Sequence, residues 1–285
     1  MGTLLSRQRL RAALLSLLIL AVAIGLWQAL TSRGAASAQL PPGMTAEYAA
    51  LMGKGAEKSD GLPPPAKVGE AFVRYLSDPF YDNGPNDKGI AIQVAYSLGR
   101  VGLGFGLAVL VALPLGFAIG MSPTLHQALD PFIQILKPIS PLAWMPLALY
   151  TIKDSSISGV FVIFICSIWP MLINTAHGVA SVRKEWLNVA RTLEVSRWRT
   201  AVEVVLPAAA PTIVTGMRIS MGIAWLVIVA AEMLVGGTGI GYFVWNEWNN
   251  LALPNVIFAI FVIGFVGMAL DWLFGRLQRL AAYRE

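Results

Sequence analysis

Four ionisable side chains lie inside stretches of this sequence that are otherwise apolar. They are Lys137, Arg218, Glu232 and Asp271. Ionisable groups are costly in lipid, so such residues usually face a helix bundle or a water-filled cavity. Arg218 and Glu232 are 14 residues apart, about 21 Å along one straight helix, and cannot pair with each other. The four residues therefore predict either a polar pathway or contacts that fix a bundle.

Motifs for catalysis and nucleotide binding are missing from the sequence. Gly53-Lys54 lacks the earlier glycine that a phosphate-binding loop requires, and the glycine-rich segment 236–241 is interpreted as a turn because no Lys-Ser or Lys-Thr pair follows it. Neither Gly-x-Ser-x-Gly nor His-Glu-x-x-His occurs. His126 and His177 are far apart in sequence, so we interpret each as structural. We expect no catalytic residue, no metal site and no enzyme activity from this chain.

The composition is that of a membrane protein. Apolar residues make up 56% of the chain and charged residues 13%, against about 45–50% and 25% in soluble domains. Its mean hydropathy is +0.65. The net charge of +5 is explained by basic cytoplasmic loops better than by a nucleic-acid partner. A single cysteine, Cys166, excludes a disulfide framework. We expect an all-α polytopic bundle in contact with membrane lipid.

About six membrane spans are expected. They cover residues 12–30, 101–121, 131–152, 157–179, 208–234 and 251–270. Prolines interrupt the third span, and five glycines in the second favour close helix packing. The first apolar run could instead be a cleaved signal peptide, because Ala36-Ser37-Ala38 resembles a cleavage site. The run is longer than a usual signal core, which favours a retained span.

The segment 31–91 differs from the rest, being rich in Pro, Gly, Asp and Lys. Its residues Val68, Ala71, Phe72, Tyr75 and Leu76 recur at helical spacing, which predicts a short amphipathic helix on the membrane surface or against the bundle. We therefore divide the chain into a cytoplasmic segment with the first span (1–30), an external insert (31–91) and a five-helix core (92–285).

A polar island, residues 181–207, separates two of the spans. It carries five Lys or Arg and three Glu residues, and we expect two short helices there that dock onto a partner. With six spans, the island and both termini fall on one side, and the positive-inside rule makes that side cytoplasmic.

The island resembles the cytoplasmic loop of bacterial ABC importer membrane subunits, in which Glu-Ala-Ala is followed at fixed spacing by Gly, Ile and Leu-Pro. Here the spacing holds for Asn188-Val189-Ala190, Glu194, Val204 and Leu206-Pro207, and the segment Ala190-Arg191-Thr192-Leu193 also matches. Asn188, Val189 and Glu194 depart from the pattern, and Glu194 stands at the bend where the family has glycine. Segments 79–105, 138–150, 161–179 and 216–245 resemble the nitrate-type permeases of that superfamily.

The resemblance implies a permease that imports a small anion, with nitrate or nitrite expected and bicarbonate, cyanate, taurine or alkanesulfonates as alternatives. It also implies a second permease copy, an external anion-binding protein and two ATPase subunits that bind Mg-ATP, this chain holding no cofactor itself. The island residues named above would couple the chain to the ATPases. Lys137 or Arg218 would add positive potential to the pathway, or Arg218 would fix the bundle, and Glu232 would be structural or part of an external gate. An ATP-independent secondary transporter is a further alternative.

Overall fold

The computed structural model describes residues 2–32, 62–84 and 87–281 of the 285-residue chain. Within these ranges the regular structure is helical, apart from an isolated antiparallel bridge between Asp82 and Lys88. The chain forms two compact units, Met1–Ser77 with Asn250–Phe258, and Asp78–Asn249 with Ala259–Glu285. Much of the expected insert, including Gly53-Lys54 and Ala36-Ser37-Ala38, lies outside the described residues.

The first unit contains α1 (Gly2–Ser32) and α3 (Pro65–Ser77). The stretch Leu10–Thr31 of α1 is long and apolar enough to cross a membrane, and none of its residues is buried. The helix expected before Pro79 is present as α3, which buries Val68, Ala71 and Tyr75. Tyr75 stacks on Phe258 with ring centroids 5.2 Å apart. The partner of α3 within this unit is therefore the beginning of α12 (Leu253–Ala281).

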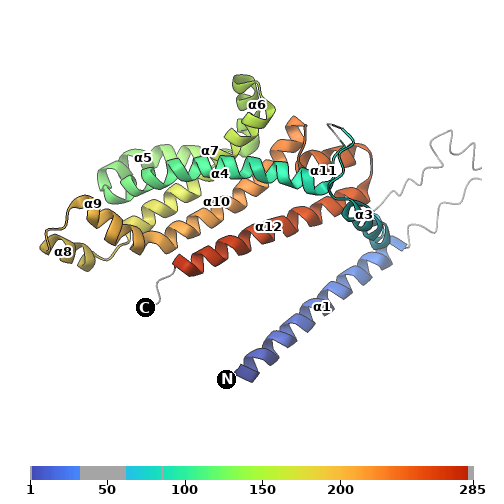
Figure 1. The fold of residues 1–285 in the computed structure, drawn as a ribbon, viewed down its shortest axis with the longest axis horizontal. Coiled ribbons are helices and arrows are strands. Elements are labelled where there is room, and N and C mark those ends of the chain that lie inside the picture. Colours follow the sequence, from blue (N-terminus) through green and yellow to red (C-terminus); the bar gives the residue numbers. More distant parts are fainter. Residues whose placement is uncertain (1, 33–61, 85–86, 282–285) are drawn as a thin grey trace, which may run out of the picture. The chain divides into compact units, whose positions relative to one another are not determined.

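The centre of the second unit is a layer of three long helices, α4 (Ile90–Met121), α7 (Ser155–Ala180) and α10 (Leu206–Val235). They run side by side, with α7 packed against both neighbours (Figure 1). Small residues permit the close approach of α4 to α7. A Cβ at Gly116 would lie 2.8 Å from the carbonyl oxygen of Leu172, whereas Gly106 has open space around it. Only some of the glycines in this span therefore serve the packing.

The third expected span, 131–152, is interrupted, as its prolines predict. The chain forms α5 (Pro123–Leu136) and α6 (Pro141–Ile152), which meet at 91° (Figure 1). Ser122 caps α5, because its hydroxyl oxygen accepts a hydrogen bond from the Leu125 N–H at 3.3 Å. The helical conformation is lost at Ser140, with φ −59° and ψ 137°, since Pro141 disfavours that conformation in the residue before it. Among the described residues, five helices are long and apolar enough to cross a membrane, or six if the bent pair counts as one span.

Three other expected boundaries also move. The second span begins at Ile90 instead of Val101, which places Arg100 inside α4. The external connection after residue 235 contains a helix, α11 (Ile240–Asn249). The last helix, α12 (Leu253–Ala281), continues past Asp271 because that carboxylate is paired with a side chain of α10 and does not end the helix. Residues 259–281 of α12 belong to the second unit.

The short segment before α4 is held by a turn. The Asp82 carboxylate accepts from the Lys88 ammonium at 2.5 Å and from the Gly84 N–H at 3.2 Å. These bonds hold the pKa of Asp82 below its ordinary value. Gly89 closes the turn against Pro79, whose backbone leaves no room for a Cβ.

Candidate functional site

The loop at residues 181–207 is anchored by an apolar cluster at the adjoining ends of α7 and α10. Val179, Val182, Val205, Ala209 and Ile213 form this cluster, with Leu187 packed against it. Leu187 belongs to α8 (Lys184–Thr192), whose one buried residue is Ala190. The inner face of α8 is thus fixed to the helix bundle.

The outer side of this loop is unusually apolar for a charged segment. Trp186, Val189, Leu193 and Trp198 are 46%, 58%, 70% and 78% exposed. Exposed apolar patches with a polar rim mark interaction surfaces. Among the expected coupling residues, Ala190 is buried and Val204 and Pro207 are half-buried; the exposed ones are Asn188, Val189, Arg191, Leu193, Glu194 and Leu206.

The bend after α8 keeps a glycine-type geometry although Glu194 occupies it. Glu194 has a φ of 52°, in the left-handed region. Its N–H donates to Arg191 O and the Val195 N–H donates to Ala190 O, both at 3.0 Å. This pair of hydrogen bonds is the Schellman motif that ends many helices, usually with glycine at the left-handed position.

The loop contains two short helices, as expected, but the second is continuous with the helix that follows it. After the bend, α9 (Arg197–Arg199) runs into a π-helical turn, η2 (Thr200–Val205), and then directly into α10. Pro207, the second residue of α10, does not end the helix, because the π-helical turn continues directly through Leu206 into α10. The second half of the loop is therefore an extension of a membrane helix.

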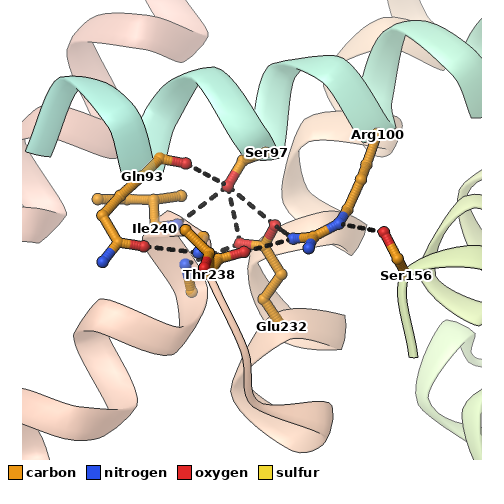
Figure 2. A network of polar contacts seen from close by, with 9 residues as sticks. Gln93, Ser97, Arg100, Ser156, Glu232, Thr238 and Ile240 are labelled. Carbon is orange, nitrogen blue, oxygen red and sulfur yellow. Dashed lines mark hydrogen bonds and ion pairs between the residues drawn. The ribbon is translucent and has the colours of Figure 1, made fainter. Parts of the chain in front are cut away.

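A buried polar network lies at the other end of the bundle (Figure 2). Glu232, 4% exposed, accepts from Arg100 Nη1 at 2.7 Å and lies within 2.9 Å of the Ser97 hydroxyl. Arg100 also donates from Nη1 to Thr238 O at 2.6 Å and from Nε to Ser156 Oγ at 3.0 Å. The network joins α4, α7 and α10 to the segment 236–241.

The same network holds the start of α11. The N–H groups at its N-terminal end donate to side chains of the other helices: Gly239 to Gln93 Oε1 at 2.6 Å, Ile240 to Ser97 Oγ at 2.9 Å and Gly241 to Glu232 Oε2 at 3.0 Å. A Cβ at Gly239 would collide with the Glu232 carboxylate, and one at Gly241 with Val229 O. The glycine-rich segment is thus a tightly held turn, as expected.

Arg218, the other charge of α10, faces α12. Its Nε and Nη2 atoms donate to the two Asp271 oxygens, each at 2.6 Å, and its Nη1 donates to Gln278 Oε1 at 3.3 Å. Gln278 Nε2 in turn donates to Thr215 Oγ1 at 2.9 Å. Bidentate Arg–carboxylate pairs fix geometry as well as charge. This contact is the arrangement that a bundle-fixing role for Arg218 requires.

Lys137 follows the last residue of α5 and lines a cavity of about 560 Å³ between α4, α5 and α7. His126 and His177 line the same cavity. Sequence separation was therefore a poor guide to these two histidines, because α5 turns back from the end of α4 and brings His126 to the cavity that His177 also lines. Within the described ranges no three His, Cys, Asp or Glu side chains come together as metal ligands.

Sequence reasoning overlooked Gln93, Ser97 and Arg100. A signal for them was available, because they stand at i, i+4 and i+7 and so share one face of an otherwise apolar helix. Placing the start of the span at Val101 left all three outside it and concealed the pattern.

Comparison with known proteins agrees with this architecture. A family described as binding-protein-dependent transport system inner membrane component matches residues 108–283. The chain is 43% identical over 228 residues to the nitrate import permease protein of Synechocystis sp., covering 80% of this chain and 83% of that one. The bicarbonate transport system permease protein of the same organism is 42% identical over 224 residues, covering 78% and 80%.

A more distant relative and a solved structure extend the comparison. The taurine transport system permease protein of Escherichia coli is 34% identical over 218 residues, covering 76% of this chain and 78% of that one. An inward-facing structure of the MetNI methionine ABC transporter matches the fold with a TM-score of 0.60 at 12% identity, covering 68% of this chain and 96% of that one.

These matches cover most of the chain, and the segment matched by the family contains the loop, α10 and α12. The chain is a multi-pass membrane subunit without catalytic activity, and ATP is hydrolysed by partner subunits. The protein belongs to the binding-protein-dependent inner-membrane components, the permease subunits of ABC importers.

Proposed function

We propose that this permease forms half of the translocation path for a small inorganic anion, nitrate or nitrite. The observation that carries the proposal is the extended similarity to a nitrate import permease, which continues through the loop and the helices around it. Bicarbonate is the second candidate, because a bicarbonate permease is nearly as similar. Both are small oxyanions, so the same path would suit either.

The complex contains two copies of this chain, two ATPase subunits that bind Mg-ATP, and an external protein that delivers the anion. Both ends of the chain lie in the cytoplasm, as its basic segments favour. The exposed apolar residues Trp186, Val189, Leu193 and Trp198 supply a surface that an ATPase subunit can cover. Buried Ala190 fixes the opposite face of α8 to the bundle.

The transport cycle requires two conformations of the helix bundle, one open outward and one open inward, that bind the partner subunits with different affinity. ATP draws the ATPase subunits together, the docked loops move with them, and the bundle switches between outward and inward access. A pathway of this kind needs a few donors for the anion but no deep charge well, because tight binding would prevent release.

The substrate is tested by reconstituting the complex in vesicles with its binding protein and ATP. We expect ATP-dependent uptake of nitrate that excess nitrite reduces and excess taurine does not. Bicarbonate uptake unaffected by nitrate would assign the chain to the second candidate, and uptake without ATPase subunits would reject the importer mechanism.

Coupling is tested separately at the loop. Ala190→Trp should expel α8 from its site, and Leu206→Asp should disturb the start of α10. Both changes should separate ATP hydrolysis from transport while the protein stays in the membrane. Asp87→Asn, in the segment before α4, is the matched control. Normal transport in both loop variants would contradict the coupling role.

A further inference from the structure

The cavity beside Lys137 brings this lysine together with two histidines to which no transport role has been given above. Its walls come from the end of α4, one side of α5 and the last part of α7. Gly120 of α4 lies against Ala176 and Val179 of α7, so these two helix ends meet closely. Since Ser122 alone separates α4 from α5, the beginning of α5 lies at that same end. The cavity therefore starts beside the loop 181–207 and extends into the bundle.

The residues of α5 and its C-terminal cap that line the cavity include four with polar side chains, beside the apolar Pro123 and Ile133. His126, Asp130, Gln134 and Lys137 all line it, and their spacing of four, four and three residues places them on one face of the helix. From His126 to Lys137 this row extends about 16 Å, at 1.5 Å per residue. His177 of α7 adds a further imidazole to the lining.

The opposite wall is apolar, with Ile119, Leu172 and Ile173 among its residues. Ligand sites commonly combine apolar walls with a few polar groups that fix orientation. Here the available groups are one ammonium and two imidazoles, which donate hydrogen bonds to an anion. The cavity volume of about 560 Å³ leaves room for an anion with part of its water shell.

The charge in the cavity is balanced so that an anion would be held only weakly. Lys137 brings one positive charge and Asp130 one negative charge. The Asp130 carboxylate accepts a hydrogen bond from Gln134 Nε2 at 2.6 Å, which occupies one of its oxygens. Lys137 stands seven residues beyond Asp130, about 10 Å along the helix, so its ammonium is free to act at the far end of the row. Weak binding is what a site on a transport route requires.

We propose that this cavity is a transient binding site for a small oxyanion on its way to the cytoplasm, with Lys137 as the inner contact and His126 and His177 as the contacts near the exit. The site rests on the proposed anion transport, and it assigns a function to two histidines that sequence analysis interpreted as structural. Each permease copy would hold one such site beside its own loop, where release of the anion and movement of the loop are close in space.

The site is tested by protecting an introduced thiol. Ile133 lines the cavity, so Ile133→Cys is made in a Cys166→Ser background and the assembled complex is treated with a water-soluble thiol reagent. We expect nitrate to slow the modification, and gluconate at equal ionic strength to leave it unchanged. Adding Lys137→Gln should raise the nitrate concentration for half-protection about tenfold, the effect of losing one charge-assisted hydrogen bond.

A matched lysine and a matched α5 residue serve as controls. Lys153→Gln removes a lysine that does not line the cavity, and Gln127→Asn changes the neighbour of His126 on the same helix. Neither should change half-protection, whereas His126→Asn should weaken it. Equal effects of Lys137→Gln and Lys153→Gln on half-protection would show that only the total positive charge matters, and this result would overturn the site.

The same measurements separate the site from the proposed function. Nitrate uptake by the parent complex without any protection by nitrate overturns the site and leaves the function standing. Protection by nitrate in a complex that transports only taurine supports the site and overturns nitrate as the substrate. A thiol that reacts in detergent but never in vesicles shows that lipid fills the cavity, and this result also overturns the proposal.

Discussion

Replacing Glu194 by glycine should stabilise the bend after α8. Glu194 holds a φ of 52°, and the left-handed region costs a residue with a Cβ about 1–2 kcal/mol. Glycine removes that cost but loses about 0.5–1 kcal/mol more backbone entropy on ordering. The difference predicts a net gain of roughly 0.5–1 kcal/mol for Glu194→Gly, since the Glu194 side chain is exposed and contributes little to the fold.

Hydrogen exchange measures this gain where it acts. The Glu194 N–H bonds to Arg191 O and the Val195 N–H to Ala190 O, so both amides exchange when the bend opens. A gain of about 0.5–1 kcal/mol corresponds to a roughly two- to fivefold higher protection factor for Val195. Protection of amides in the middle of α7 should not change.

Glu194→Ala is the matched control, because it removes the carboxylate and keeps the Cβ. We expect no gain in protection from the alanine variant. An equal gain from alanine and glycine would assign the effect to the side-chain charge and refute the reasoning from backbone conformation. Lower protection in the glycine variant would show that Glu194 makes a stabilising contact at this bend.

Three further predictions concern the bundle. Arg100→Gln should lower the free energy of unfolding by about 3–5 kcal/mol, because it leaves the buried Glu232 without its counter-charge, and adding Glu232→Gln should recover much of the loss in thermal unfolding of the purified protein. Asp271→Asn should speed hydrogen exchange in α12, since Arg218 then loses its bidentate partner. Gly116→Leu should separate α4 from α7 and reduce the folded yield in size-exclusion chromatography, because the added Cβ meets the Leu172 backbone at 2.8 Å.

Each of these has a result that would contradict it. The prediction for the buried pair is contradicted if the double variant Arg100→Gln with Glu232→Gln is no more stable than Arg100→Gln alone. For α12, the contradicting result is unchanged exchange in Asp271→Asn; Asp130→Asn, on α5, is the control there. For the packing, Gly106→Leu is the control because its surroundings are open, and equal yields of both leucine variants would show that the close approach at Gly116 is unimportant.

The membrane class and most of the helices could be predicted from the sequence because they depend on apolar runs and proline positions. The break in the third span shows the limit of that reasoning. Pro138 and Pro141 announced an interruption, but the 91° angle depends on how α6 packs against α7 and α10. Local sequence carries no information on that packing, so the prolines alone could not distinguish a sharp bend between two helices from a non-helical interruption of a straight span.

The candidate sites show the same division. Spacing along the chain was enough to locate the loop 181–207, because its pattern is local. The Arg100–Glu232 pair joins residues 132 positions apart, and the two histidines line one cavity only because α5 turns back from the end of α4. Such pairs depend on tertiary contacts. Their polar members could be recognised as unusual inside apolar helices, but their partners could not be assigned.

The continuity of α9, η2 and α10 has a mechanical consequence. Residues Arg197–Val235 form one helical stretch of 39 residues, about 58 Å long at 1.5 Å per residue. Exposed Trp198 lies at one end of this helical stretch. Near the other end, Glu232 pairs with Arg100 of α4. A displacement of the helix end at Arg197 is therefore transmitted along the stretch, because no loop interrupts it. The hydrogen-bonding register of this stretch changes at the π-helical turn η2, so a bend in response to movement of the loop is expected there.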